Sequence, residues 1–84
     1  MEERKLKDHK YAQCKVLVTP NQIAFVSYRT TVIVADLETR EIECGGTYSQ
    51  TTRKQIGWFL KEYFPNVSYY DIKEIAGTTR TIRF

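Results

Sequence analysis

The sequence predicts an α+β fold: a small antiparallel sheet of three to five strands packed against one main α-helix, with a second short helix favoured after it. Short β-branched and apolar runs, separated by turn residues, occupy the first half of the chain, and a segment with apolar residues at helical spacing follows them. The length of 84 residues leaves room for one domain only, because so short a chain cannot bury two cores.

Composition and charge indicate an ordinary soluble domain. Apolar residues make up 42% of the chain and charged residues 27%, which suits a thin two-layer core under a solvated surface. The formal net charge of +3 is compatible with a nucleic-acid partner or an acidic protein partner, and no dense basic tract singles out either. No stretch reaches the length of a membrane span, and the N-terminus lacks a secretory apolar run. We therefore expect a cytoplasmic protein without a membrane partner.

The beginning of the chain differs in composition from the rest. Residues 1–10 form a charged run with a single leucine, and we expect them to be a weakly ordered lead-in. The remaining residues, 11–84, are expected to form the single α+β domain.

Four short segments fit the strands of a sheet. They are rich in β-branched side chains or alternate apolar with charged ones, and turn residues such as Pro20-Asn21 and Gly45-Gly46 follow them. Adjacent segments are expected to pair antiparallel, because a meander needs only short connections. The four segments are residues 14–19, 22–28, 31–36 and 41–44.

The segment 52–64 has the clearest helix signal in the chain. Thr52 and Gln55 fit a capping box, and Pro65 ends the segment. On a helical wheel the apolar side chains fall within an arc of roughly 100°, which is wide enough to cover a sheet. These side chains are Ile56, Phe59, Leu60 and Tyr63.

The end of the chain is less distinctive. Residues 68–76 fit either a short capped helix that ends at Gly77 or an irregular strand, and the helix is favoured. Residues 78–84 alternate in polarity, which predicts a return to the sheet.

The chain lacks the residue patterns of common enzymes and metal sites. Its single histidine, His9, lies in the charged lead-in, and no serine or cysteine has a recognisable base or nucleophile elbow. Cys14 and Cys44 have no metal-site spacing with a partner ligand, so they are interpreted as buried thiols. We therefore expect no catalytic residue, no metal and no cofactor, and predict that the protein is not an enzyme.

Residues 45–54 combine glycines, hydroxyl side chains and two cations at the start of the predicted helix. Free N–H groups at a helix N-terminus attract anions, so Ser49, Thr51 and Thr52 are candidate anion-binding residues. The same hydroxyls are what ordinary capping requires, and the Gly-Lys-Ser/Thr ending of a phosphate-binding loop is missing. Structural capping is the favoured interpretation.

Trp58 lies outside the apolar arc of the predicted helix. Lys54 and Lys61 flank it at helical spacing, and Arg53 lies near the start of the same helix. A large aromatic side chain among cations is typical of macromolecular contact surfaces, so Arg53, Lys54, Trp58 and Lys61 are the candidate partner-binding residues. The alternative is that the tyrosine-containing segment 65–70 folds over Trp58 and buries it.

Residues 23–64 resemble small uncharacterised proteins of bacteriophages and phage-like elements. The similarity rests on a Tyr-Ser-x-Thr-Thr-x-Lys stretch that opens the helix. In this chain the stretch consists of Tyr48, Ser49, Thr51, Thr52 and Lys54. The resemblance implies a viral accessory protein that acts in the cytoplasm of the host cell by binding a host protein or nucleic acid, but it carries no defined activity.

Three functional hypotheses follow. The leading one is a non-catalytic binding module, a phage accessory protein that binds or inhibits a host protein such as a defence-system component. The second is a small nucleic-acid-binding protein whose basic helix meets phosphates through Arg53 and Lys54. The third is a homodimeric structural protein that buries Trp58 against a second copy of itself.

Overall fold

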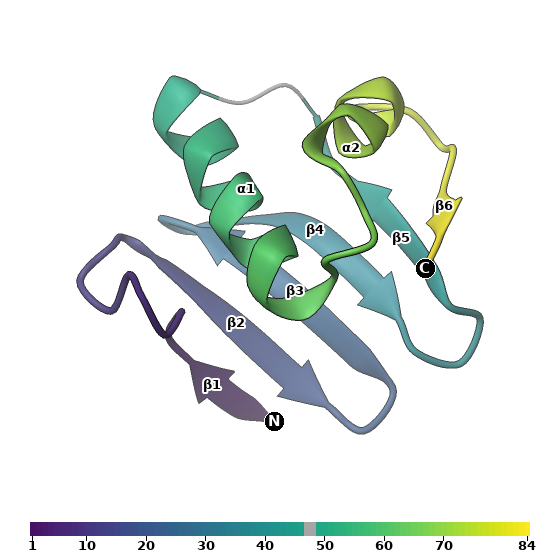
Figure 1. Ribbon diagram of the computed structural model, residues 1–84. Coiled ribbons are helices and arrows are strands. Elements are labelled where there is room, and N and C mark those ends of the chain that lie inside the picture. Colours follow the sequence, from purple (N-terminus) through teal and green to yellow (C-terminus); the bar gives the residue numbers. More distant parts are fainter. Residues whose placement is uncertain (47–48) are drawn as a thin grey trace.

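Figure 1 shows the computed structural model of the protein, which describes residues 1–46 and 49–84. In these residues six antiparallel strands form one sheet, and the strands follow one another across the sheet in chain order. The strands are β1 (Glu2–Arg4), β2 (Cys14–Thr19), β3 (Gln22–Ser27), β4 (Thr30–Asp36), β5 (Glu41–Cys44) and β6 (Ile82–Arg83). The predicted α+β class is confirmed, whereas the predicted range of three to five strands was too low.

Two helices, α1 (Gln50–Tyr63) and α2 (Tyr69–Ile75), cover one face of the sheet (Figure 1). The chain passes through both helices between β5 and β6. The favoured short helix after Pro65 is present as α2, and its N-terminus is a capping box in which the Ser68 and Asp71 side chains each accept a hydrogen bond from the other residue's backbone N–H. After α2, Gly77 adopts φ 75°, a left-handed conformation that suits glycine.

The N-terminal residues are part of the sheet, which differs from the expected weakly ordered lead-in. Strand β1 pairs with β2, so that Glu3 lies opposite Leu17, and the Glu3 carboxylate forms an ion pair with Lys15. Leu6, the single leucine of this segment, is only 1% exposed. The charged composition gives no sign of this strand in the sequence, because an edge strand that pairs through its backbone needs no alternation of apolar residues.

The middle strands form two tight hairpins. Pro20 and Asn21 connect β2 to β3, as predicted, and Tyr28 and Arg29 connect β3 to β4. The predicted strand 22–28 ends one residue early because Tyr28 adopts φ 57°, which belongs to a turn and not to a strand.

The core lies between the sheet and the helices. Its centre is the contact between Phe25 of β3 and Phe59 of α1, whose rings stack with centroids 4.6 Å apart. Burying one such side chain stabilises the fold by about 1.5 to 3 kcal/mol. Around the pair lie apolar side chains from β2, β4 and β5 that point to the same side of the sheet. They include Cys14, Val16, Ile33, Ala35, Ile42 and Cys44.

The C-terminus is held at the far edge of the sheet from the N-terminus (Figure 1). Only two residues of the predicted strand 78–84 pair with β5. The following residue, Phe84, packs against Phe64 with ring centroids 4.6 Å apart. Its backbone N–H donates to the carbonyl of Arg40, and the Arg40 Nε–H donates to the carbonyl of Phe84.

The face of the sheet opposite the helices carries several carboxylates. Asp36, Glu41 and Glu43 line a shallow hollow of about 210 Å³ around the half-buried Val34. This acidic face contrasts with the helix side of the molecule, where several exposed lysines and an arginine lie on α1 and α2.

Two glycine substitutions are expected to change stability in opposite directions. Gly57 lies inside α1 with no atom within 4 Å of the position that a Cβ would take, so Gly57→Ala should raise the free energy of unfolding by about 1 kcal/mol. Gly77→Ala places a side chain on a residue with a φ of 75° and should lower the free energy of unfolding by about 1 to 2 kcal/mol. Thermal melts measure both effects, expected as opposite shifts of roughly 4 to 8 °C per kcal/mol. A lower melting temperature for Gly57→Ala would contradict this packing of α1.

Candidate functional site

The hydroxyl side chains at the start of α1 are used by the fold itself. Helix α1 begins at Gln50, two residues before the predicted start, and its N-cap is Ser49, whose Oγ accepts a hydrogen bond from the backbone N–H of Thr52. The predicted capping box of Thr52 and Gln55 is therefore wrong. Thr51 is exposed, and Thr52 and Gln55 are both buried.

Thr52 and Gln55 take part in a buried chain of hydrogen bonds that joins α1 to β3. The Ser27 hydroxyl of β3 donates to Gln55 Oε1 at 2.6 Å and lies 3.0 Å from the Thr52 hydroxyl. Because Ser27 has one proton, which goes to Gln55, the Thr52 hydroxyl must donate to Ser27 and accept from Ser49. Two of the three candidate anion-binding hydroxyls, Ser49 and Thr52, are thus engaged inside the protein.

Trp58 is half-buried, and the N-terminal part of the chain covers one face of its indole. The imidazole of His9 stacks on the indole with ring centroids 3.5 Å apart and an interplanar angle of 6°. Lys54 Nζ lies 5.7 Å from the centroid of the Trp58 ring. The aromatic partner of Trp58 is therefore in the connection between β1 and β2, and not in the segment 65–70 that the alternative interpretation named.

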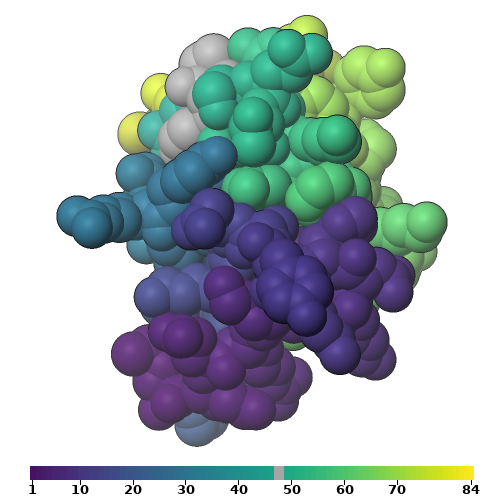
Figure 2. Space-filling view, turned by 90° about the vertical axis from the view of Figure 1, so that its left-hand side faces the viewer, coloured from purple at the N-terminus to yellow at the C-terminus, as the bar shows by residue number. Residues whose placement is uncertain are grey.

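A second contact holds this connection against α1. The backbone N–H of Lys7 donates to Glu62 Oε1 at 2.9 Å. Figure 2 shows the N-terminal residues, in purple, lying directly against α1, in teal and green. Trp58, Lys61 and Glu62 line an open hollow of about 350 Å³ together with Lys7, Asp8 and His9. We call the side chains that line this hollow, together with Lys54, the Trp58 surface.

Arg53 lies apart from the other three candidate partner-binding residues. It is on the side of α1 that faces α2, and it lines a separate cavity with Tyr69 and Lys73 of α2. On the helical wheel Arg53 and Trp58 are roughly 140° apart. The structure therefore brings Lys54, Trp58 and Lys61 together and assigns Arg53 to a different surface. The position of Lys73 in this cavity lining was not predicted, because nothing in the sequence indicates which helix face meets a neighbouring helix.

Both cysteines are buried and free, as the sequence analysis interpreted them. Burial raises the pKa of each thiol above its ordinary value, which keeps the neutral form at physiological pH. Among residues 1–46 and 49–84, no group of three or more histidine, cysteine or acidic side chains is placed to hold a metal ion. No helix in the same residues is long and apolar enough to cross a membrane.

Removing the Ser27 hydroxyl is expected to weaken the attachment of α1. Ser27→Ala leaves the buried Gln55 carbonyl and the Thr52 hydroxyl without their partner, so the free energy of unfolding should fall by about 1 to 3 kcal/mol in urea denaturation. Thr51→Ala is the matched control: it removes an exposed hydroxyl from the same helix and should change stability by less than about 0.5 kcal/mol. Equal losses in the two variants would show that the buried hydrogen bonds do not hold the helix.

Comparison with known proteins gives a family but no activity. Tyr48, the first residue of the stretch behind the phage resemblance, lies outside the described residues. No curated protein and no solved structure matches the chain. A model of a family of unknown function, DUF8033, matches residues 2–76, which include strands β1 to β5 and both helices. The protein is a member of the DUF8033 family.

Proposed function

We propose that the protein is a non-catalytic binding module that holds a partner protein at the Trp58 surface. The observation that carries this proposal is the stack of His9 on Trp58 with Lys54 beside the same ring. It joins residues from two distant parts of the chain into one surface.

The stack supports binding because it limits the conformational freedom of the contact residues. A free indole must lose side-chain entropy when a partner orders it, whereas Trp58 is already held between His9 and the core. Tryptophan is also among the side chains that contribute most to the binding energy of protein interfaces. The Trp58 surface is thus preorganised around a half-buried indole that is already held in place.

Asp8 and Glu62 line the hollow beside Trp58, and the three lysines around it, Lys7, Lys54 and Lys61, favour an acidic segment of the partner. Lys54 and Lys61 are exposed, and neither forms an ion pair with any residue in the described part of the chain. Carboxylates of a partner can therefore approach both ammonium groups without displacing an existing bridge. Complementary charge of this kind raises the association rate and orients the two proteins.

The resemblance to phage proteins supplies the cellular context of the proposal. A phage accessory protein acts in the cytoplasm of the infected cell, so the partner would be a host protein, and a component of a defence system fits this role. The membership in DUF8033 is compatible with this context and adds no activity to it.

Charge reversal on α1 tests the proposal. Lys54→Glu combined with Lys61→Glu should reduce capture of the partner from host lysate by about tenfold or more, because the two new carboxylates would repel those of the partner. Arg29→Glu combined with Arg80→Glu is the matched control, with the same change in net charge at exposed positions outside the Trp58 surface. Quantitative mass spectrometry measures the captured protein. Equal loss in both double variants, or unchanged capture by Lys54→Glu/Lys61→Glu, would overturn the assignment of the surface.

Nucleic-acid binding is the second candidate function, because Arg53, Lys54 and Lys61 are exposed on one helix. This candidate predicts that nuclease treatment abolishes capture and that affinity falls steeply as salt rises from about 50 to 200 mM. A protein partner predicts capture that survives nuclease. His9 already occupies one face of the indole, which disfavours stacking of a base on that face.

A further inference from the structure

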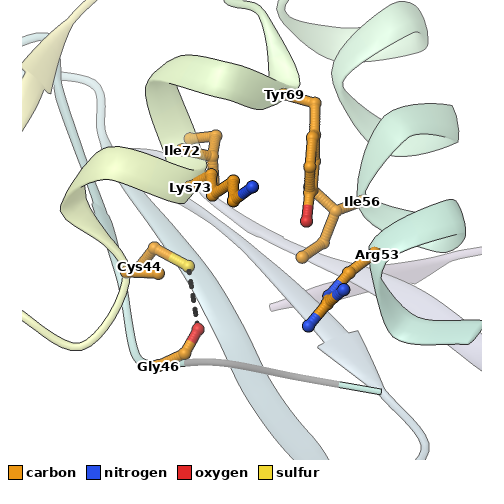
Figure 3. A pocket seen from close by; sticks show the side chains of 8 residues that line it. Cys44, Gly46, Arg53, Ile56, Tyr69, Ile72 and Lys73 are labelled. Carbon is orange, nitrogen blue, oxygen red and sulfur yellow. Dashed lines mark hydrogen bonds between the residues drawn. The ribbon is translucent and has the colours of Figure 1, made fainter. Parts of the chain in front are cut away.

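A cavity of about 180 Å³ opens between α1, α2 and the end of β5. Figure 3 shows its lining side chains, which come from all three elements. This volume corresponds to about six water molecules, so it is large enough for a small organic molecule and too small for a folded chain segment. Nothing in the family assignment or in the proposed function involves this cavity.

The inner wall of the cavity is apolar. Ile56 of α1, Ile72 of α2 and Cys44 of β5 line it but are at most 3% exposed, so the half-buried Tyr69 and Ala76 supply most of the apolar surface that a ligand can contact. The Cys44 thiol hydrogen-bonds weakly to the carbonyl of Gly46, with an Sγ to oxygen distance of 4.0 Å. Because its burial raises its pKa, this thiol remains neutral and contributes to the apolar wall.

Three polar side chains converge on the same space. In Figure 3 the Arg53 guanidinium comes from α1, and the Lys73 ammonium and the Tyr69 hydroxyl come from α2. Within the described residues, neither Arg53 nor Lys73 forms an ion pair. Arg53 and Lys73 are both exposed, so an anion from solvent can approach both charges. All three side chains can also donate hydrogen bonds to such an anion.

We infer that this cavity binds a small organic anion, a carboxylate or phosphate that carries a compact apolar group. The anionic head lies between Arg53 and Lys73, with the Tyr69 hydroxyl as a further donor, and the apolar group lies against Ala76 and the Tyr69 ring. Ligand sites commonly combine a mostly apolar wall with a few convergent polar groups, and this cavity has both parts. Arg53 thereby acquires a role that is separate from partner binding at the Trp58 surface.

The anionic head and the apolar group each contribute to the affinity of the ligand. Four simple probes can therefore test the ligand class. Benzoate and phenyl phosphate carry both parts, inorganic phosphate lacks the apolar group, and benzyl alcohol lacks the charge. At least one of the first two should bind with a Kd below about 1 mM, as expected for a ligand of this size. Inorganic phosphate and benzyl alcohol should each bind at least about tenfold more weakly than that probe.

Two-dimensional amide NMR of the intact protein locates the binding. Titration with the probes should give saturable shifts at Cys44, Ile56, Ile72 and Ala76, with smaller changes at Trp58. The same spectra show whether each variant remains folded. Absence of saturation by both benzoate and phenyl phosphate up to roughly 10 mM would overturn the inference, since this bounds the Kd above the range expected for such ligands. Saturable shifts centred elsewhere would overturn it as well.

Charge-neutralising substitutions distinguish the contribution of Arg53 and Lys73 to ligand binding from that of exposed cations elsewhere on the protein. Arg53→Gln combined with Lys73→Gln should weaken binding of the charged probe about tenfold or more, because both charge-assisted hydrogen bonds are lost. Arg29→Gln combined with Arg80→Gln is the matched control, since it removes two exposed charges outside both the cavity lining and the Trp58 surface. An equal effect in both double variants would indicate a general charge effect and contradict a built site. Because the lining does not include Lys54 or Lys61, this result is independent of the partner-capture experiment.

Discussion

The rotation of α1 about its own axis depends on one contact, the stack of Phe59 on Phe25. This stack fixes which side of the helix faces the sheet, and the hydrogen bonds from Ser27 to Thr52 and Gln55 fix the same side near the N-terminus of the helix. Once the rotation is set, Trp58 must emerge toward the N-terminal connection and Arg53 toward α2. The two candidate binding surfaces are therefore consequences of how the helix is buried, and any change in that rotation would alter both of them.

Much of the fold could be predicted from local patterns. The central strands and both helices follow from β-branched runs, turn residues and helical spacing, which are properties of neighbouring residues in the chain. Strand β1 could not be predicted in this way, because its three residues are all charged and its pairing with β2 depends on backbone groups. The length of β6 also depends on a distant contact, since Phe84 is held by Phe64 and Arg40.

The candidate site was predictable to a smaller degree. The sequence places Lys54, Trp58 and Lys61 on one side of a helix, and the structure keeps these three together. The sequence contains no signal that His9 stacks on Trp58 or that Lys73 lines the same cavity as Arg53. Each pair joins parts of the chain that only tertiary packing brings together. Ser49 and Thr52 carried an ambiguous signal, since helix capping and anion binding require the same hydroxyl side chains.

Both margins of the sheet are formed by very short strands, three residues in β1 and two in β6, and each carries at least one exposed charged side chain. Each margin therefore offers few unsatisfied backbone groups to an incoming strand from another molecule, and the charges oppose such an approach. Edge-to-edge pairing of strands from different molecules, a common first step in the formation of fibrous aggregates, is therefore disfavoured at both edges of the sheet. Association between copies through their strand edges is thus disfavoured, while the helical side remains open to other molecules.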